Sequence, residues 1–155
     1  MLDAIAQVFV QLHLRFLEEF AVALAPVCLT VILHGQGMGL AALYLRRYGR
    51  RSGQGPPAAL RNILIVAVVT IMLATHFLEI IAWAAFYFFT GMLNAPGTAI
   101  DFSIGSYTTL GTGSVSLRGH WQGLEGFETM AAMLMWGWST AVLVGVVQTI
   151  RSSDD

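Results

Sequence analysis

The chain has 155 residues, of which 56% are hydrophobic and 11% are charged, whereas an ordinary soluble domain has roughly 25% charged residues. This composition excludes a soluble globular domain, because too few polar side chains remain to cover its surface. The net charge of −1 and the absence of lysine leave no basic surface suited to nucleic acid. Cys28 is the single cysteine, so no disulfide can form within one chain.

The N-terminal segment, residues 1–19, shows apolar side chains at helical spacing. Ile5, Val8, Leu12 and Phe16 recur every three or four residues, with polar side chains between them. This pattern predicts an amphipathic helix on the outer membrane interface. An extension of the first spanning helix accounts for the same pattern, so both interpretations stay open.

Residues 20–45 form the first long apolar run and carry no formal charge. About 20 apolar residues are enough to cross the hydrocarbon core of a bilayer. The following residues, 46–57, contain four arginines, three glycines and two prolines, a composition that predicts a loop. Arginine is enriched in cytoplasmic loops. We therefore expect a multi-pass protein of the cell membrane, with its N-terminus outside and its C-terminus in the cytoplasm.

The second predicted span covers residues 62–93, and its apolar run from Ile63 onward contains two strongly polar side chains, His76 and Glu79. A carboxylate inside a membrane is costly and usually has a partner. We expect His76 and Glu79 to brace the short helix that follows. The candidate contacts on that helix are Ser103, Ser106 and Tyr107. Proton sensing by His76 or Glu79 is the alternative.

Residues 98–114 contain a segment too short to span a membrane. Residues 98–107 predict a short helix with Thr98 as its N-cap. Gly111 and Gly113 follow, and non-helical backbone at membrane depth occurs only where protein buries it or water lines it. The segment therefore predicts a re-entrant loop whose carbonyls could coordinate a cation. Because one strand cannot surround an ion, this interpretation requires several chains.

The third apolar run, residues 129–150, carries no charged residue. Glu125 and Glu128 precede it, where carboxylates favour a helix N-terminus and attract cations. We assign both to an outer vestibule, with capping alone as the alternative. A stripe within the run is assigned to an inner cavity or gate, with lipid contact or packing as the alternative; its members are Gly137, Thr140, Val144 and Gln148.

The segment after the short helix resembles the selectivity filter of potassium channels, which reads Thr-Thr-Val-Gly-Tyr-Gly. The matching residues here are Thr108, Thr109, Leu110, Gly111, Thr112 and Gly113. From about residue 20 to 150 the chain is similar to small bacterial ion-channel proteins related to two-pore-domain potassium channels. The flanking matches are His76-x-x-Glu79-Ile80-x-x-Trp83 and Met135-Trp136-Gly137-Trp138.

This resemblance implies an all-α membrane protein with three transmembrane helices, a re-entrant pore helix and a selectivity-filter loop. It divides the chain into the N-terminal segment 1–19 and a pore domain of residues 20–155. The resemblance further implies a homotetramer in the lipid bilayer that coordinates K⁺ through the carbonyls of residues 108–113. It implies no cofactor beyond the permeant cation, and no sequence motif indicates an enzyme.

Two departures from the family pattern concern selectivity. The family tyrosine is Thr112 here, and the aspartate that follows the filter is Ser114. In the family that tyrosine braces the filter against the pore helix, which a threonine is too short to do. A nonselective cation channel that also passes Na⁺ is therefore an alternative.

A function of another class is a haem or metal protein built in a membrane helix bundle. His34 and His76 lie on successive spans, and counting 1.5 Å per residue places them at similar depth. Two such histidines could ligate haem or a metal ion. Nothing in that scheme requires the Gly111-Thr112-Gly113 turn.

Overall fold

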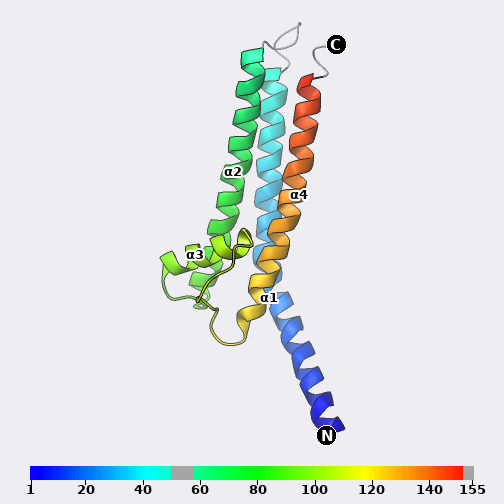
Figure 1. The fold of residues 1–155 in the computed structure, drawn as a ribbon, viewed down its shortest axis with the longest axis vertical. Coiled ribbons are helices and arrows are strands. Elements are labelled where there is room, and N and C mark those ends of the chain that lie inside the picture. Colours follow the sequence, from blue (N-terminus) through cyan, green and yellow to red (C-terminus); the bar gives the residue numbers. More distant parts are fainter. Residues whose placement is uncertain (50–57, 152–155) are drawn as a thin grey trace. The chain divides into compact units, whose positions relative to one another are not determined.

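The computed structural model describes residues 1–49 and 58–151 (Figure 1). Every regular element in these ranges is helical: α1 (Leu2–Gly49), α2 (Ala58–Phe89), α3 (Pro96–Tyr107), the short 3₁₀ helix η1 (Trp121–Gly123) and α4 (Leu124–Arg151). Three of them, α1, α2 and α4, are long and apolar enough to cross a membrane. The expectation of an all-α protein with three such helices is confirmed, and this is the pattern of a multi-pass membrane protein.

Helix α1 is longer than the predicted first span, because residues 2–19 continue into it without a break. The helix is thus an extension of the first span, as one of the two interpretations had it, and the interfacial position stays a prediction. Arg46 and Arg47 belong to its last turn rather than to the connector. The remainder of the predicted connector, with Arg50 and Arg51, lies outside the described residues.

Helix α2 ends at Phe89, before the predicted end at residue 93. Gly91 has a φ of 73°, a left-handed conformation that glycine adopts without steric cost and that ends many helices. The amide of Leu93 then donates to the carbonyl of Tyr87, 3.1 Å away. Helix α3 begins at Pro96, with Ala95 in the N-cap position. The expected N-cap, Thr98, lies inside the helix instead, because proline at the first helical position already starts it.

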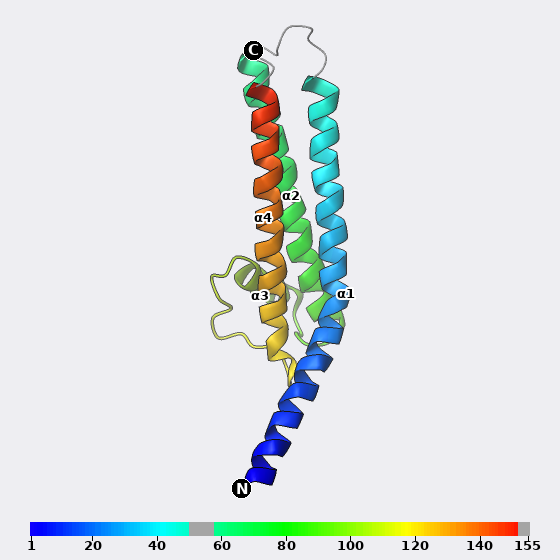
Figure 2. The same ribbon diagram turned by 90° about the vertical axis from the view of Figure 1, so that its right-hand side faces the viewer.

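The described chain falls into two compact units, and each is described separately. The first comprises residues 1–30 and 80–132. Within it, Trp83 Nε1 donates to Thr30 Oγ1 over 2.9 Å and so links α1 to α2. Tyr87 meets Phe102 edge to face with ring centroids 5.2 Å apart, which holds α3 against α2. Figures 1 and 2 show α3 running across, rather than along, the neighbouring part of α2.

The second unit comprises residues 31–79 and 133–155, that is, the remaining parts of α1, α2 and α4. Its core is aliphatic and draws on all three helices. The buried members are Met38, Ala41, Leu64, Val68, Met72, Val146 and Ile150.

Large apolar side chains remain exposed along the three long helices. They include Ile32, Leu43, Val66, Leu73, Phe77, Ile81, Met133 and Leu134. So much exposed apolar surface would be unfavourable in water, whereas hydrocarbon tails or further copies of the chain can cover it. The exposure therefore agrees with the membrane assignment.

Candidate functional site

The residues predicted as a filter follow α3 directly, in the first unit. Thr109, Gly111 and Gly113 have φ values of 61°, 91° and 64°, whereas no other non-glycine residue among those described has a positive φ. The sign of φ therefore alternates from residue to residue between 109 and 113. Glycine adopts such a conformation freely, but Thr109 is β-branched and strained there.

This segment leaves one side open. Leu110 is 84% exposed, and Thr109, Gly111 and Gly113 are exposed as well. Thr112 is half-buried. Residues 109–111 and 113 thus form an exposed surface in the single chain.

The opposite side of the segment contacts α3 backbone to backbone at Gly105. The amide of Gly111 donates to the carbonyl of Gly105 over 3.2 Å. A Cβ atom at position 105 would lie 3.0 Å from the Gly111 carbonyl carbon and 3.3 Å from Thr112 Cα, and closer still to the Gly111 oxygen. Only glycine permits this approach, so Gly105 sets where the segment lies on α3.

A buried carboxylate on α4 holds α3 in place through hydrogen bonds. Glu128 on α4 is fully buried, with Ser103 Oγ 2.5 Å from its Oε1 and Tyr87 Oη donating to its Oε2 over 2.9 Å. Ser103 Oγ also lies 3.0 Å from the carbonyl of Ile80. Glu128 thus joins α2, α3 and α4 through hydrogen bonds.

This arrangement corrects the expected vestibule role of Glu128, while the bracing role expected of Glu79 stays a prediction. Glu128 does not line an open vestibule, because its side chain is enclosed by α2 and α3. The carboxylate that hydrogen-bonds to α3 in the first unit is that of Glu128, whereas Glu79, the residue expected to brace α3, lies 2.8 Å from His34 Nδ1 in the second unit. Tyr107, the third residue assigned to bracing, is buried against Ile80 and Ala132.

Glu125 and Thr129 on α4 also contact this region. Thr129 Oγ1 donates to the carbonyl of Ser106 over 2.9 Å. Thr112 Oγ1 lies 3.4 Å from Glu125 Oε1. Glu125 is half-buried and thus keeps the access to solvent that Glu128 lacks. Thr112 has a side-chain contact of its own, although a different one from that of the family tyrosine.

The second unit contains a separate polar cluster. His34 on α1 and His76 on α2 approach each other, with ring centroids 5.3 Å apart, and both lie near Glu79. Ser139 on α4 completes the cluster, 3.1 Å from His76 Nε2. The sequence predicted a shared depth for the two histidines but did not include Ser139.

The stripe assigned to an inner cavity lies on α4 within this second unit. Gly137, Thr140, Val144 and Gln148 are all exposed in the single chain. Exposure is compatible with a cavity, with lipid and with a neighbouring chain, so the assignment stays a prediction.

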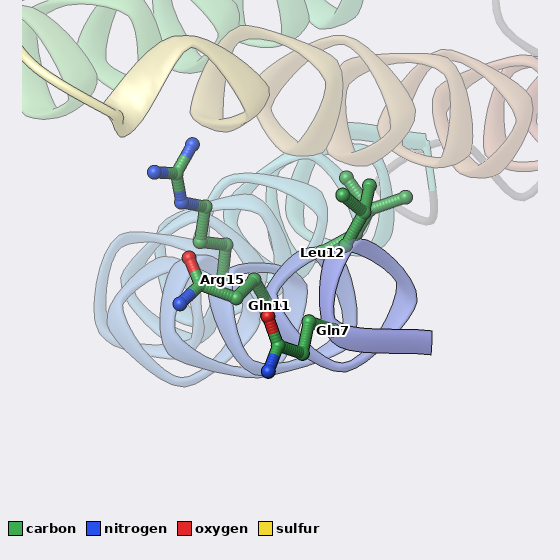
Figure 3. Close-up of a pocket in the computed structure, with 5 residues that line it drawn as sticks. Gln7, Gln11, Leu12 and Arg15 are labelled. Carbon is green, nitrogen blue, oxygen red and sulfur yellow. The ribbon is translucent and has the colours of Figure 1, made fainter. Parts of the chain in front are cut away.

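A surface hollow follows the N-terminal part of α1. Figure 3 shows its lining, which includes Gln7, Gln11, Leu12 and Arg15 and comes from this one helix. A hollow formed by one helix has no opposing wall to hold a ligand, and we assign no site to it.

Gly105 is the residue that sequence reasoning missed. A glycine inside a helix lowers helix stability by roughly 1 kcal/mol relative to alanine. This unfavourable residue choice was the sequence signal that could have identified Gly105. A glycine kept in the middle of a 12-residue helix indicates a close approach by another backbone.

Comparisons with known proteins add no relative to this description. No protein-family model, no curated protein and no solved structure matches the chain.

Proposed function

We propose that four copies of this chain assemble into a cation channel that conducts potassium through the backbone carbonyls of residues 108–113. The observation that carries the proposal is the alternating sign of φ from Thr109 through Gly111 to Gly113. A backbone whose φ alternates in sign can turn successive carbonyls toward one side, and a ring of carbonyls can replace the hydration shell of an ion. The re-entrant position of α3 belongs to this proposal.

Fourfold symmetry supplies the closed ring of carbonyls that one chain cannot form alone. A closed ring of identical contacts surrounds an axis, and the exposed side of residues 109–113 is the surface that would face it. Glu125 then belongs to an outer vestibule, and the exposed stripe of Gly137, Thr140, Val144 and Gln148 lines the inner cavity. The Arg46 and Arg47 end of α1 lies in the cytoplasm.

The test is ion flux into liposomes that contain the purified protein. We expect uptake of K⁺, with Na⁺ and an impermeant organic cation compared in parallel, and a native mass of four chains. Flux of K⁺ and Na⁺ at equal rates would establish the nonselective alternative. Active preparations that contain only monomers or dimers would contradict the proposed ring.

Selectivity is expected to depend on Thr112. Thr112→Tyr combined with Ser114→Asp restores the residues of the resembling family, so the outer part of the segment should become stiffer and the K⁺/Na⁺ permeability ratio should rise. Each 1.4 kcal/mol of added discrimination changes this ratio about tenfold, which a bi-ionic reversal potential can detect.

The control is Thr112→Val, which keeps the shape of threonine and removes the hydroxyl that faces Glu125. Assembly of each variant is checked first by native mass. A wild type that is already strongly potassium-selective, with a ratio unchanged by the double substitution, would show that Thr112 supports a selective filter by itself.

A further inference from the structure

The polar cluster of the second unit has no role in the proposed channel. His34 and Glu79 are fully buried there, and the His76 side chain keeps 16% exposure. One ligand atom from each of these three residues can be chosen so that all lie within 4.8 Å of one another. The cluster combines two imidazoles with a carboxylate, a donor set that suits first-row transition metals.

The two imidazole rings are oriented alike. Their Nδ1 atoms face the Glu79 carboxylate, with His34 Nδ1 2.8 Å from Oε1 and His76 Nδ1 3.5 Å from Oε2. Their Nε2 atoms face Ser139 Oγ, at 3.4 Å from His34 and 3.1 Å from His76. The carboxylate and the hydroxyl thus lie at opposite ends of the ring pair.

The hydrogen positions on the two imidazoles depend on their tautomers, and one arrangement places both hydrogens on Nε2. Ser139 can donate its one hydrogen to Met38 Sδ, 3.9 Å away, and its oxygen then accepts hydrogens from both Nε2 atoms. Each neutral imidazole carries a single hydrogen, so in this arrangement both Nδ1 lone pairs are directed toward the Glu79 carboxylate, where a cation can bind between them. In the other tautomers an Nδ1 atom donates to the carboxylate, and a metal ion would displace that hydrogen.

We propose that His34 Nδ1, His76 Nδ1 and the Glu79 carboxylate bind a divalent transition-metal ion, with Zn²⁺ as the representative. Bond lengths of 2.0–2.1 Å in a tetrahedral zinc site place neighbouring ligand atoms about 3.3 Å apart, and the two contacts to Glu79, 2.8 and 3.5 Å, bracket this value. Three protein ligands leave a fourth position for water. Ser139 accepts the Nε2 hydrogens and so orients both ligands.

The charge of the cluster agrees with an ion rather than with haem. Two neutral imidazoles and one carboxylate carry a formal charge of −1, which is costly to bury without a cation. Axial histidines on the two faces of a haem would be separated by the porphyrin, whereas here one carboxylate contacts both rings. The ion would link α1 to α2 inside this unit.

The test measures binding of Co²⁺, a spectroscopic substitute for Zn²⁺, to tag-free protein in detergent. We expect one Co²⁺ per chain, with the intense visible bands of a tetrahedral site, and displacement by Zn²⁺. The measurement needs no ion flux, so its result is independent of the proposed channel. Absence of these bands at excess Co²⁺ would overturn the proposal.

Substitutions of the cluster residues test which of them bind the metal ion. Glu79→Gln and His76→Gln should each weaken Co²⁺ binding at least a hundredfold, and Ser139→Ala should weaken it about tenfold, as loss of an outer-shell partner does. The control is His120→Gln, which removes an exposed histidine of the first unit and should leave the affinity unchanged. Folding of each variant is verified by helical circular dichroism and a single gel-filtration peak. Unchanged affinity in a folded His34→Gln/His76→Gln double variant would also overturn the proposal.

Discussion

Replacing Glu128 with alanine should lower the free energy of unfolding by about 2–4 kcal/mol, because Tyr87 and Ser103 would each lose a buried hydrogen-bond partner, at roughly 1–3 kcal/mol for each group. The same change should abolish ion flux, since α3 would lose its link to α4. The measurements are reversible unfolding in mixed micelles and liposome flux.

Glu128→Gln is the informative companion. A hydroxyl has one hydrogen, so Ser103 cannot donate to Ile80 and to Glu128 at the same time. A glutamine amide can donate to Ser103 and accept from Tyr87, so this variant should keep most of the wild-type stability.

Glu125→Ala is the matched control. Glu125 is a half-buried carboxylate on the same helix, with one long contact to Thr112. Its removal should cost less than about 0.5 kcal/mol, as for most surface substitutions. Equal, mild effects of Glu128→Ala and Glu125→Ala would contradict the assigned brace.

The number and type of the long helices could be predicted from the sequence, because a long apolar run in a membrane satisfies its backbone hydrogen bonds by forming a helix. The buried face of α2 could also be predicted in large part. Glu79, Trp83 and Tyr87 share one helical stripe and are fully buried. Thr90, the next member of that stripe, is exposed.

The partners of the two buried carboxylates, Glu79 and Glu128, could not be predicted. Helical periodicity gives the direction in which Glu79 points from α2, but not which helix it meets there. That helix is α1, through His34, whereas α3 is reached by Glu128 from α4. Such pairs depend on contacts between residues far apart in the sequence, 45 and 25 positions here, and a single sequence contains no record of them.

Gly105→Ala should reduce stability and ion flux, although alanine is the better helix former. Intrinsic helix propensity alone would make the alanine variant more stable by roughly 1 kcal/mol. Against this, the new methyl group would overlap the backbone of Gly111 and Thr112, and overpacking a tight site costs typically 1–3 kcal/mol. A backbone cannot turn away as a flexible side chain can, so the cost should exceed the gain.

The matched control is Gly97→Ala, two residues into the same helix. Apart from its chain neighbours and the backbone of its own helix, a Cβ atom there meets nothing within 4 Å, so this substitution should leave flux unchanged and stabilise the protein slightly. Both variants gain the same methyl group on α3, and the difference between them isolates the contact with residues 111–112. If Gly105→Ala proved as stable and as active as Gly97→Ala, the segment would not depend on its approach to α3. Because unfolding is measured separately from flux, loss of stability in Gly105→Ala alone would confirm the packing even in a protein that conducts no ions.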